Sequence, residues 1–221
     1  MNKTIEILLV DDYPFTIDGY TNYLKNFERK NLNLSFKIQS AVCCQTCIEI
    51  LDKYYFDIIF LDIRIPSTND NKFNSGEDIA NYVKKKFPKT KVVVITGHFE
   101  PLILGNIIQT SNPIGLIYKT DFDQLILENL LTSILVDIPF YSSSILKLLR
   151  KNISSSIILT KTDKLLILEI SKGKKTKELT SIVPLSIGGI EKRKRALKQL
   201  FGIPKANDTE LIDSVIKKGF L

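Results

Sequence analysis

The chain has 221 residues, of which 44% are apolar and 25% charged, a composition typical of one or two folded domains and unlike that of a disordered or fibrous protein. It has no run of about 18 apolar residues, and the apolar stretch 5–10 meets two aspartates too early for a secretory signal, so we expect neither a membrane span nor export. The net charge of +7 is uneven: residues 1–150 carry 16 basic and 17 acidic side chains, whereas residues 151–221 carry 15 and 7. We therefore expect a cytoplasmic protein of two units, whose basic unit either binds a polyanion or is merely lysine-rich at its surface.

Residues 1–137 alternate short apolar runs with stretches of helical spacing. The runs predict five strands, at 5–10, 34–42, 58–61, 91–96 and 114–118. Between and after them, apolar residues recur every three or four positions, which predicts five helices. Because the runs are continuous, we expect a parallel sheet with helices on both faces. Ligands bind such sheets at the carboxyl ends of the strands.

Residues 138–158 are rich in serine, with Pro139 near their start, and they surround an apolar and basic stretch at 145–151. This composition predicts a linker with a short helix inside it. The third segment, 159–221, has only helical patterns. These predict four helices, at 160–170, 176–182, 186–201 and 208–218.

Polar residues interrupt the apolar pattern where the predicted strands end. They are Asp11, Asp12, Asp62, Thr96 and Lys119. Three carboxylates at one sheet edge would repel each other without a hard cation, and oxygen ligands of this kind suit Mg²⁺. With a hydroxyl and an ammonium nearby, one carboxylate could act as a nucleophile and form an acyl phosphate.

The segments V-D-D-Y-P, L-D-I-R-I-P, V-V-V-I-T-G and I-Y-K-T resemble the receiver domain of bacterial two-component response regulators. The resemblance covers about residues 3–137 and implies a flavodoxin-like α/β fold with a five-stranded parallel sheet. It also implies that Asp62 is the phosphoacceptor. The implied protein ligands of Mg²⁺ are Asp11, Asp12, Asp62 and the backbone carbonyl of Arg64, with Asp11 acting mostly through water.

The same resemblance implies that Thr96 is the switch hydroxyl and that Lys119 binds the phosphoryl group. The family usually has an aromatic switch residue three positions before the lysine, where this chain has Leu116. Tyr118 is adjacent to the lysine and is expected on the opposite sheet face from it. The loop 66–76 is longer than usual and borders the metal site, which indicates either a role in kinase docking or dephosphorylation or a tolerated surface insertion.

The segment 159–221 resembles the LuxR-type helix-turn-helix of the NarL/FixJ family, in which the second helix of the motif enters the major groove. Here that helix is strongly basic, and its apolar stripe is Ile190, Leu197 and Phe201. By position, Glu191, Lys192 and Arg195 face base edges, while Lys194 and Lys198 contact the phosphate backbone. Gly189 replaces a hydroxyl residue of the family, and the final helix, 208–218, corresponds to its dimerisation helix.

The sequence thus predicts a response regulator that a histidine kinase phosphorylates on Asp62 with Mg²⁺, and that binds promoter DNA as a homodimer. We expect no enzymatic activity beyond phosphotransfer to itself and autodephosphorylation. One alternative is a Mg²⁺-dependent aspartyl-phosphate phosphohydrolase. The other is a receiver whose basic domain contacts a protein or a membrane.

Overall fold

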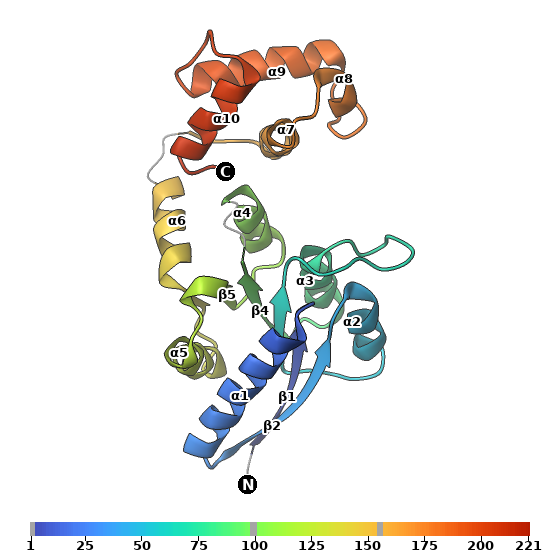
Figure 1. Ribbon diagram of the computed structural model, residues 1–221, viewed down its shortest axis with the longest axis vertical. Helices are drawn as coiled ribbons and strands as arrows, with labels where there is room; N and C mark the ends of the chain where they lie inside the picture. Colours follow the sequence, from blue (N-terminus) through green and yellow to red (C-terminus); the bar gives the residue numbers. More distant parts are fainter. Residues whose placement is uncertain (1–2, 98–100, 154–156) are drawn as a thin grey trace. The chain divides into compact units, whose positions relative to one another are not determined.

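The computed structural model describes residues 3–97, 101–153 and 157–221 (Figure 1). Residues 154–156 of the predicted linker lie outside this description. The chain divides into two compact units, with the main boundary along the chain after Leu146. Each unit is treated by itself below. Among the helices that the structure describes, none combines the length and the apolar character that crossing a bilayer requires.

The first unit is built on a parallel sheet, as predicted. Its strand order is β2-β1-β3-β4-β5-β6, and every neighbouring pair is parallel. The strands are β1 (Lys3–Val10), β2 (Leu34–Ala41), β3 (Ile58–Asp62), β4 (Lys91–Thr96), β5 (Gly115–Tyr118) and β6 (Phe140–Tyr141). All five residues of β3 are buried, because this strand lies in the middle of the sheet and is covered on both faces.

Helices alternate with these strands along the chain. They are α1 (Pro14–Lys30), α2 (Cys44–Leu51), α3 (Gly76–Lys86), α4 (Pro101–Thr110) and α5 (Gln124–Leu135), and a short 3₁₀ turn, η1 (Lys119–Asp121), follows β5. Figure 1 shows α1 and α5 on one side of the sheet and α2 and α3 on the other. The core on the first side joins Leu24 of α1 and Leu131 of α5 to Phe60 and Ile117 of the sheet, all of them buried. Full burial of one such side chain stabilises the fold by about 1.5 to 3 kcal/mol.

The sixth strand corrects the prediction of a five-stranded sheet, and it lies within the segment 138–158 that the sequence predicts as a linker. Residues Phe140 and Tyr141 form β6 beside β5, and the Phe140 amide donates to the carbonyl of Ile114 at 2.8 Å. The helix α6 (Ser143–Ile153) follows directly and is longer than the predicted stretch 145–151. A strand of two residues leaves no periodic pattern in a sequence, which explains why it was missed.

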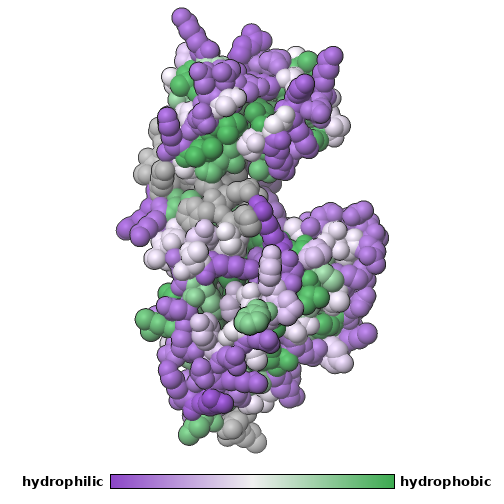
Figure 2. Space-filling view, in the orientation of Figure 1, coloured by the Kyte–Doolittle hydropathy of each residue, from purple (hydrophilic) through white to green (hydrophobic). Residues whose placement is uncertain are grey.

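The second unit contains the four predicted helices. They are α7 (Lys161–Ser171), α8 (Thr176–Leu179), α9 (Ile187–Leu200) and α10 (Asp208–Lys217). The predicted capping box at the start of α7 is present, since Thr160 and Asp163 bond each other's backbone amides. The helices enclose a core that includes Leu166, Leu179 and Leu197. Figure 2 shows hydrophilic side chains over much of the visible face of this unit.

Candidate functional site

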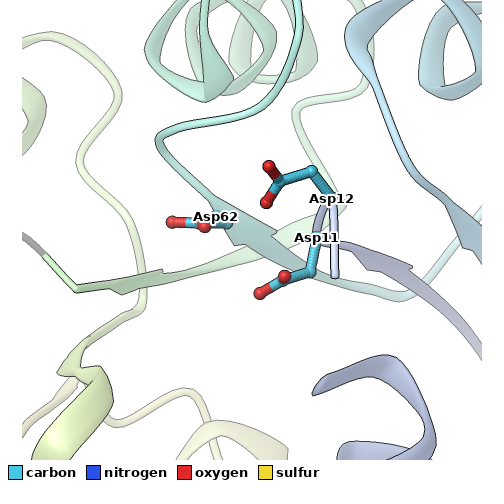
Figure 3. Close-up of side chains that lie close together, drawn as sticks. All are labelled: Asp11, Asp12 and Asp62. Atoms are coloured by element: carbon cyan, nitrogen blue, oxygen red, sulfur yellow. The ribbon is translucent and has the colours of Figure 1, made fainter. Parts of the chain in front are cut away.

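Three carboxylates meet at the carboxyl end of the sheet, where the sequence predicts a site (Figure 3). Strands β1 and β3 are neighbours in register, with Val10 opposite Leu61, so Asp11 and Asp62 emerge side by side. One oxygen each of Asp11, Asp12 and Asp62 lies within 4.8 Å of the others. Asp11 is 1% exposed and Asp62 is 6% exposed, so their charges are largely removed from water.

Lys119 binds two of these carboxylates. Its Nζ lies 2.7 Å from Oδ2 of Asp11 and 2.7 Å from Oδ2 of Asp62. Burial raises the pKa of Asp62 above its ordinary value, although the hydrogen bond from Lys119 opposes that rise. Burial lowers the pKa of Lys119, but its bonds with Asp11 and Asp62 outweigh this, so its net pKa is raised and its ammonium stays charged at neutral pH.

The residues present fit a bound divalent cation. Asp12 has a buried oxygen, Oδ1, without a hydrogen-bond partner in the described part of the chain. Leaving a carboxylate oxygen buried and unpartnered is unfavourable, and a ligand at this position would satisfy it. Three carboxylates against one ammonium also leave a surplus of negative charge. An all-oxygen donor set of this kind matches Mg²⁺.

Gly76, which the sequence analysis did not single out, supports the backbone of Asp62. A Cβ atom at position 76 would lie only 2.0 Å from the carbonyl oxygen of Asp62, so only glycine allows this approach. The amide of Gly76 also donates to the carbonyl of Ile63 at 2.8 Å. A glycine directly after the N-cap Ser75 of a predicted helix was the available signal.

The long loop 66–76 is folded on itself. The amide of Thr68 donates to the carbonyl of Phe73 at 2.8 Å, and the Thr68 hydroxyl donates to Oδ1 of Asp70 at 2.6 Å. Thr68 is 5% exposed. These bonds give the loop a defined turn that brings the chain back to Gly76.

Thr96 ends β4 next to the carboxylates and is 1% exposed. In the register of β4 and β5, Val94 is opposite Leu116 and Thr96 is opposite Tyr118. Ile117 points into the core beneath α1 and α5, so Leu116 and Tyr118 share the other face of the sheet. The aromatic residue paired with Thr96 is thus Tyr118, and the buried Leu116 lies two residues earlier on the same face of β5.

The basic helix α9 uses two of its lysines inside the second unit. Lys194 Nζ donates to Oδ2 of Asp208 at 2.6 Å and to the hydroxyl of Thr176 at 2.8 Å, and its side chain is 5% exposed. Lys198 pairs with Oδ1 of Asp208 at 2.9 Å. The sequence predicts that Lys194 and Lys198 contact DNA phosphates. In the structure, Asp208 at the start of α10 binds both ammonium groups within the unit.

Arg193 is also held within the unit, by the nearly buried carboxylate of Asp163. The pKa of Asp163 is lowered: burial alone would raise it, but hydrogen bonds from Arg193 and Thr160 outweigh burial. Other predicted residues of α9 are exposed, namely Glu191, Lys192 and Arg195. The outer face of α9 therefore presents fewer cations than the sequence indicates.

Comparison with known families matches residues 7–125 to the response regulator receiver domain. Among curated proteins, the transcriptional regulatory protein RcsB of Salmonella typhi and that of Escherichia coli K12 are each 24% identical over 106 residues. These matches cover 48% of this chain and 45% of each relative, so the chain spans about half the length of the curated relatives it matches.

Solved structures extend the likeness of fold to the second unit. The structure of the response regulator RcsB in complex with DNA has a TM-score of 0.65 at 19% identity, covering 97% of this chain and 98% of the other. RcsB from Salmonella enterica serovar Typhimurium, bound to a promoter in the presence of a phosphomimetic, has a TM-score of 0.67 at 19% identity and covers 96% and 98%. At this identity the matches establish a common fold.

Proposed function

This chain belongs to the response regulator receiver family, and from that premise we propose that it is a transcription regulator controlled by phosphorylation of Asp62. The observation that carries the proposal is the ammonium of Lys119, 2.7 Å from both Asp11 and Asp62, at the sheet edge where Thr96 also ends its strand. A histidine kinase as phosphodonor and promoter DNA as target would place the protein in the bacterial cytoplasm.

The chemistry follows from the placement of these groups. A carboxylate oxygen of Asp62 attacks the phosphorus of a phosphohistidine, the P–N bond breaks, and the imidazole leaves with the bonding electron pair. The ammonium of Lys119 and the hydroxyl of Thr96 then bind oxygens of the new acyl phosphate. Mg²⁺ would be held by Asp11, Asp12, Asp62 and the carbonyl of Arg64, and would supply positive charge to the transferring group.

The test is the intact mass of the full chain after incubation with acetyl phosphate and Mg²⁺. We expect one added phosphoryl group on the wild type and on Asp18→Asn, a matched control that removes an exposed carboxylate of α1. We expect none on Asp62→Asn. An unchanged gain in Asp62→Asn would contradict the proposal, and rapid multiple turnover of a phosphate ester would favour the phosphohydrolase alternative.

For the second unit we propose sequence-specific DNA binding through the exposed side of α9, which carries Glu191, Lys192 and Arg195. The guanidinium of Arg195 is suited to the two acceptors of guanine in the major groove. Lys194 and Lys198 would support α9 from inside through Asp208. The likeness in fold to RcsB bound to DNA supports this proposal.

Binding to a library of duplexes at several salt concentrations tests the DNA proposal. We expect affinity to fall steeply with salt, because phosphate contacts release counterions. Arg195→Ala is expected to lose discrimination at one base pair, by about 1 to 3 kcal/mol. Lys192→Ala should weaken binding to all sequences. Binding to anionic vesicles with no preference among duplexes would favour the membrane alternative.

We also propose that the active form is a homodimer joined through α10. Leu211 and Val215 of this helix are buried in the core of their own unit, whereas Ile216 is 50% exposed. An exposed apolar residue at this position is available for a second copy. In sedimentation with DNA, Ile216→Glu should bind each half-site as a separate chain, with no cooperativity between the two half-sites.

A further inference from the structure

A short segment after α5 is bound to the strand that precedes Lys119. We define the strap as residues 140–146, which comprise β6 and the first turn of α6. Besides the bond from the Phe140 amide, the amide of Ser142 donates to the carbonyl of Leu116 at 3.0 Å. The hydroxyl of Ser142 accepts from the amide of Tyr118 at 3.2 Å, and Ser142 is 1% exposed.

The start of α6 is bound to the turn that carries Lys119. Oδ2 of Asp121 accepts from the amide of Ser144 at 3.0 Å, and Oδ1 of Asp121 accepts from the hydroxyl of Ser144 at 2.8 Å. Asp121 thus supplies the first turn of α6 with the hydrogen bonds of a helix cap, from a position more than 20 residues earlier in the chain.

Lys119 and Asp121 belong to one 3₁₀ turn, η1, which is closed by the bond from the Phe122 amide to the Lys119 carbonyl at 3.2 Å. One end of this turn holds the carboxylates of the phosphoacceptor site, and the other end holds Ser144. A shift of the Lys119 backbone therefore moves the group that caps α6.

We propose that the strap is a conformational relay, in which a change at the Asp62–Lys119 ion pair moves the turn 119–121 and thereby releases the start of α6. This inference rests on the proposed phosphorylation of Asp62. A phosphoryl group on Asp62 occupies the position of the present contact with Lys119, so the ammonium must move to an oxygen farther from the Asp62 backbone. The helix α6 leads along the chain into the second unit.

The strap is suited to this role because its pairing with the sheet is short. Its strand has two residues, and in the described part of the chain it is also held by the bonds of Ser142, the cap from Asp121, and the packing of Phe140 and the buried Ile145. A cap of this kind stabilises by about 1 kcal/mol. A helix start that depends on one cap opens locally at a lower free energy than the whole unit unfolds, so a change at the capping residue shifts this equilibrium.

The test is amide hydrogen exchange of the strap in the full chain, with and without beryllofluoride and Mg²⁺ as a phosphoryl mimic. Site occupancy is followed in the same samples by the ¹⁹F signal of bound beryllofluoride. In the wild type we expect the amides of Phe140, Ser142 and Ser144 to exchange about fivefold faster or more when the mimic is bound. The exposed neighbour Ser143 provides the control, and Ser143→Ala should behave as the wild type.

Ser144→Ala removes the hydroxyl bond to Asp121. It should give fast exchange of the strap before the mimic is added, and little further change afterwards. Coupling between two sites is reciprocal, so this variant should also bind beryllofluoride more tightly than Ser143→Ala does. Asp121→Asn, which weakens the same cap from the receiver side, should give the same two results.

The outcomes separate the two proposals. Bound mimic with unchanged exchange of the strap in the wild type would overturn the relay and leave the phosphoacceptor site intact. Equal mimic affinities for Ser144→Ala and Ser143→Ala would also overturn the relay. If the wild type neither binds the mimic nor gains a phosphoryl group, the function proposed for Asp62 fails, and the relay fails with it.

Discussion

The two units each contain a cluster in which lysine ammonium groups lie among carboxylates, and the clusters differ in charge balance. At the sheet edge, one ammonium, that of Lys119, faces three carboxylates, and one carboxylate oxygen, Asp12 Oδ1, is buried without a partner in the described part of the chain. In the second unit, each oxygen of Asp208 binds a lysine, Lys194 or Lys198, and Glu191 lies 3.8 Å from Lys194, so two carboxylates face two ammonium groups.

This difference distinguishes a ligand site from a structural one. A cluster with surplus charge and an unpartnered buried oxygen is stabilised further by an added ion of opposite charge. A cluster whose polar atoms are satisfied gains nothing from an added ion and instead fixes the packing of its own helices. The sequence shows lysine and aspartate in both places, so only the contacts distinguish the two cases.

The largest expected effect concerns the backbone beneath the first cluster. If packing rather than ion pairs holds Asp62 in place, Gly76→Ala should destabilise the first unit by about 3 kcal/mol, because its Cβ would meet the Asp62 carbonyl at 2.0 Å. Urea denaturation followed by hydrogen exchange of peptides from this unit measures the loss.

Gly19→Ala is the matched control for this substitution. Gly19 lies in α1 and has open space around the position of a Cβ, so the change should raise stability slightly. Phosphorylation of Gly76→Ala by acetyl phosphate should also be slower. Equal stability of the two variants would show that the carboxylates alone hold the site together.

The second cluster should respond strongly to the loss of Asp208, the carboxylate that both lysines share. Asp208→Ala leaves the nearly buried ammonium of Lys194 facing the more distant carboxylate of Glu191, at 3.8 Å, and we expect the second unit to lose about 2 kcal/mol. Asp208 itself is partly exposed, which keeps the loss below that of a fully buried pair. Asp213→Ala, on the exposed side of α10, should change stability by less than about 0.5 kcal/mol.

Removing one carboxylate charge from the first cluster should raise the stability of its unit, the opposite of the effect expected in the second unit. Asp12→Asn removes one of three like charges, so without Mg²⁺ it should stabilise the first unit by about 1 kcal/mol. It should also abolish the stabilisation that added Mg²⁺ gives to the wild type. Thermal unfolding with and without Mg²⁺ measures both effects. A loss of stability in Asp12→Asn without Mg²⁺ would remove the contrast between the clusters.

The sequence predicted the first cluster well and the second poorly, for a physical reason. In a parallel sheet the carboxyl ends of neighbouring strands meet at one edge, so finding Asp11, Asp62 and Lys119 at strand ends was enough to bring them together. On α9 the helical repeat identifies exposed and buried faces, but Lys194 reaches Asp208 on a later helix. No local pattern reports such a contact.

The strap and Gly76 were missed for a related reason. The pairing of Phe140 with Gly115 joins segments 25 residues apart through a strand of two residues. The approach of Gly76 to Asp62 depends on the fold of the loop between them. Elements with a long repeat could be predicted with their approximate bounds, whereas contacts made by one or two residues required coordinates.

The smallest expected effect is a loss of stability of the second unit as the pH is lowered. Burial alone would raise the pKa of Asp208, but hydrogen bonds from Lys194 and Lys198 outweigh burial, so the pKa is lowered. The pKa of Asp163 is also lowered, because its hydrogen bond with Arg193 contributes in the same way. A carboxyl whose pKa is lower in the folded state stabilises that state above its unfolded pKa, about 3.9. This stability is lost as the pH falls through the folded pKa.

Chemical denaturation of the full chain between about pH 5 and pH 3 measures this dependence. We expect the second unit to lose stability over this range and Asp208→Ala to lose less, since it has one carboxyl fewer to protonate. The comparison must be made between these two proteins, because other carboxyls titrate equally in both. Equal slopes would mean that Asp208 is not held ionised by its lysines, and the second cluster would then not be the structural ion-pair cluster that the contacts indicate. Protonating Asp208 has the same consequence as deleting it, because either change takes the nearer of two carboxylate charges from the buried Lys194.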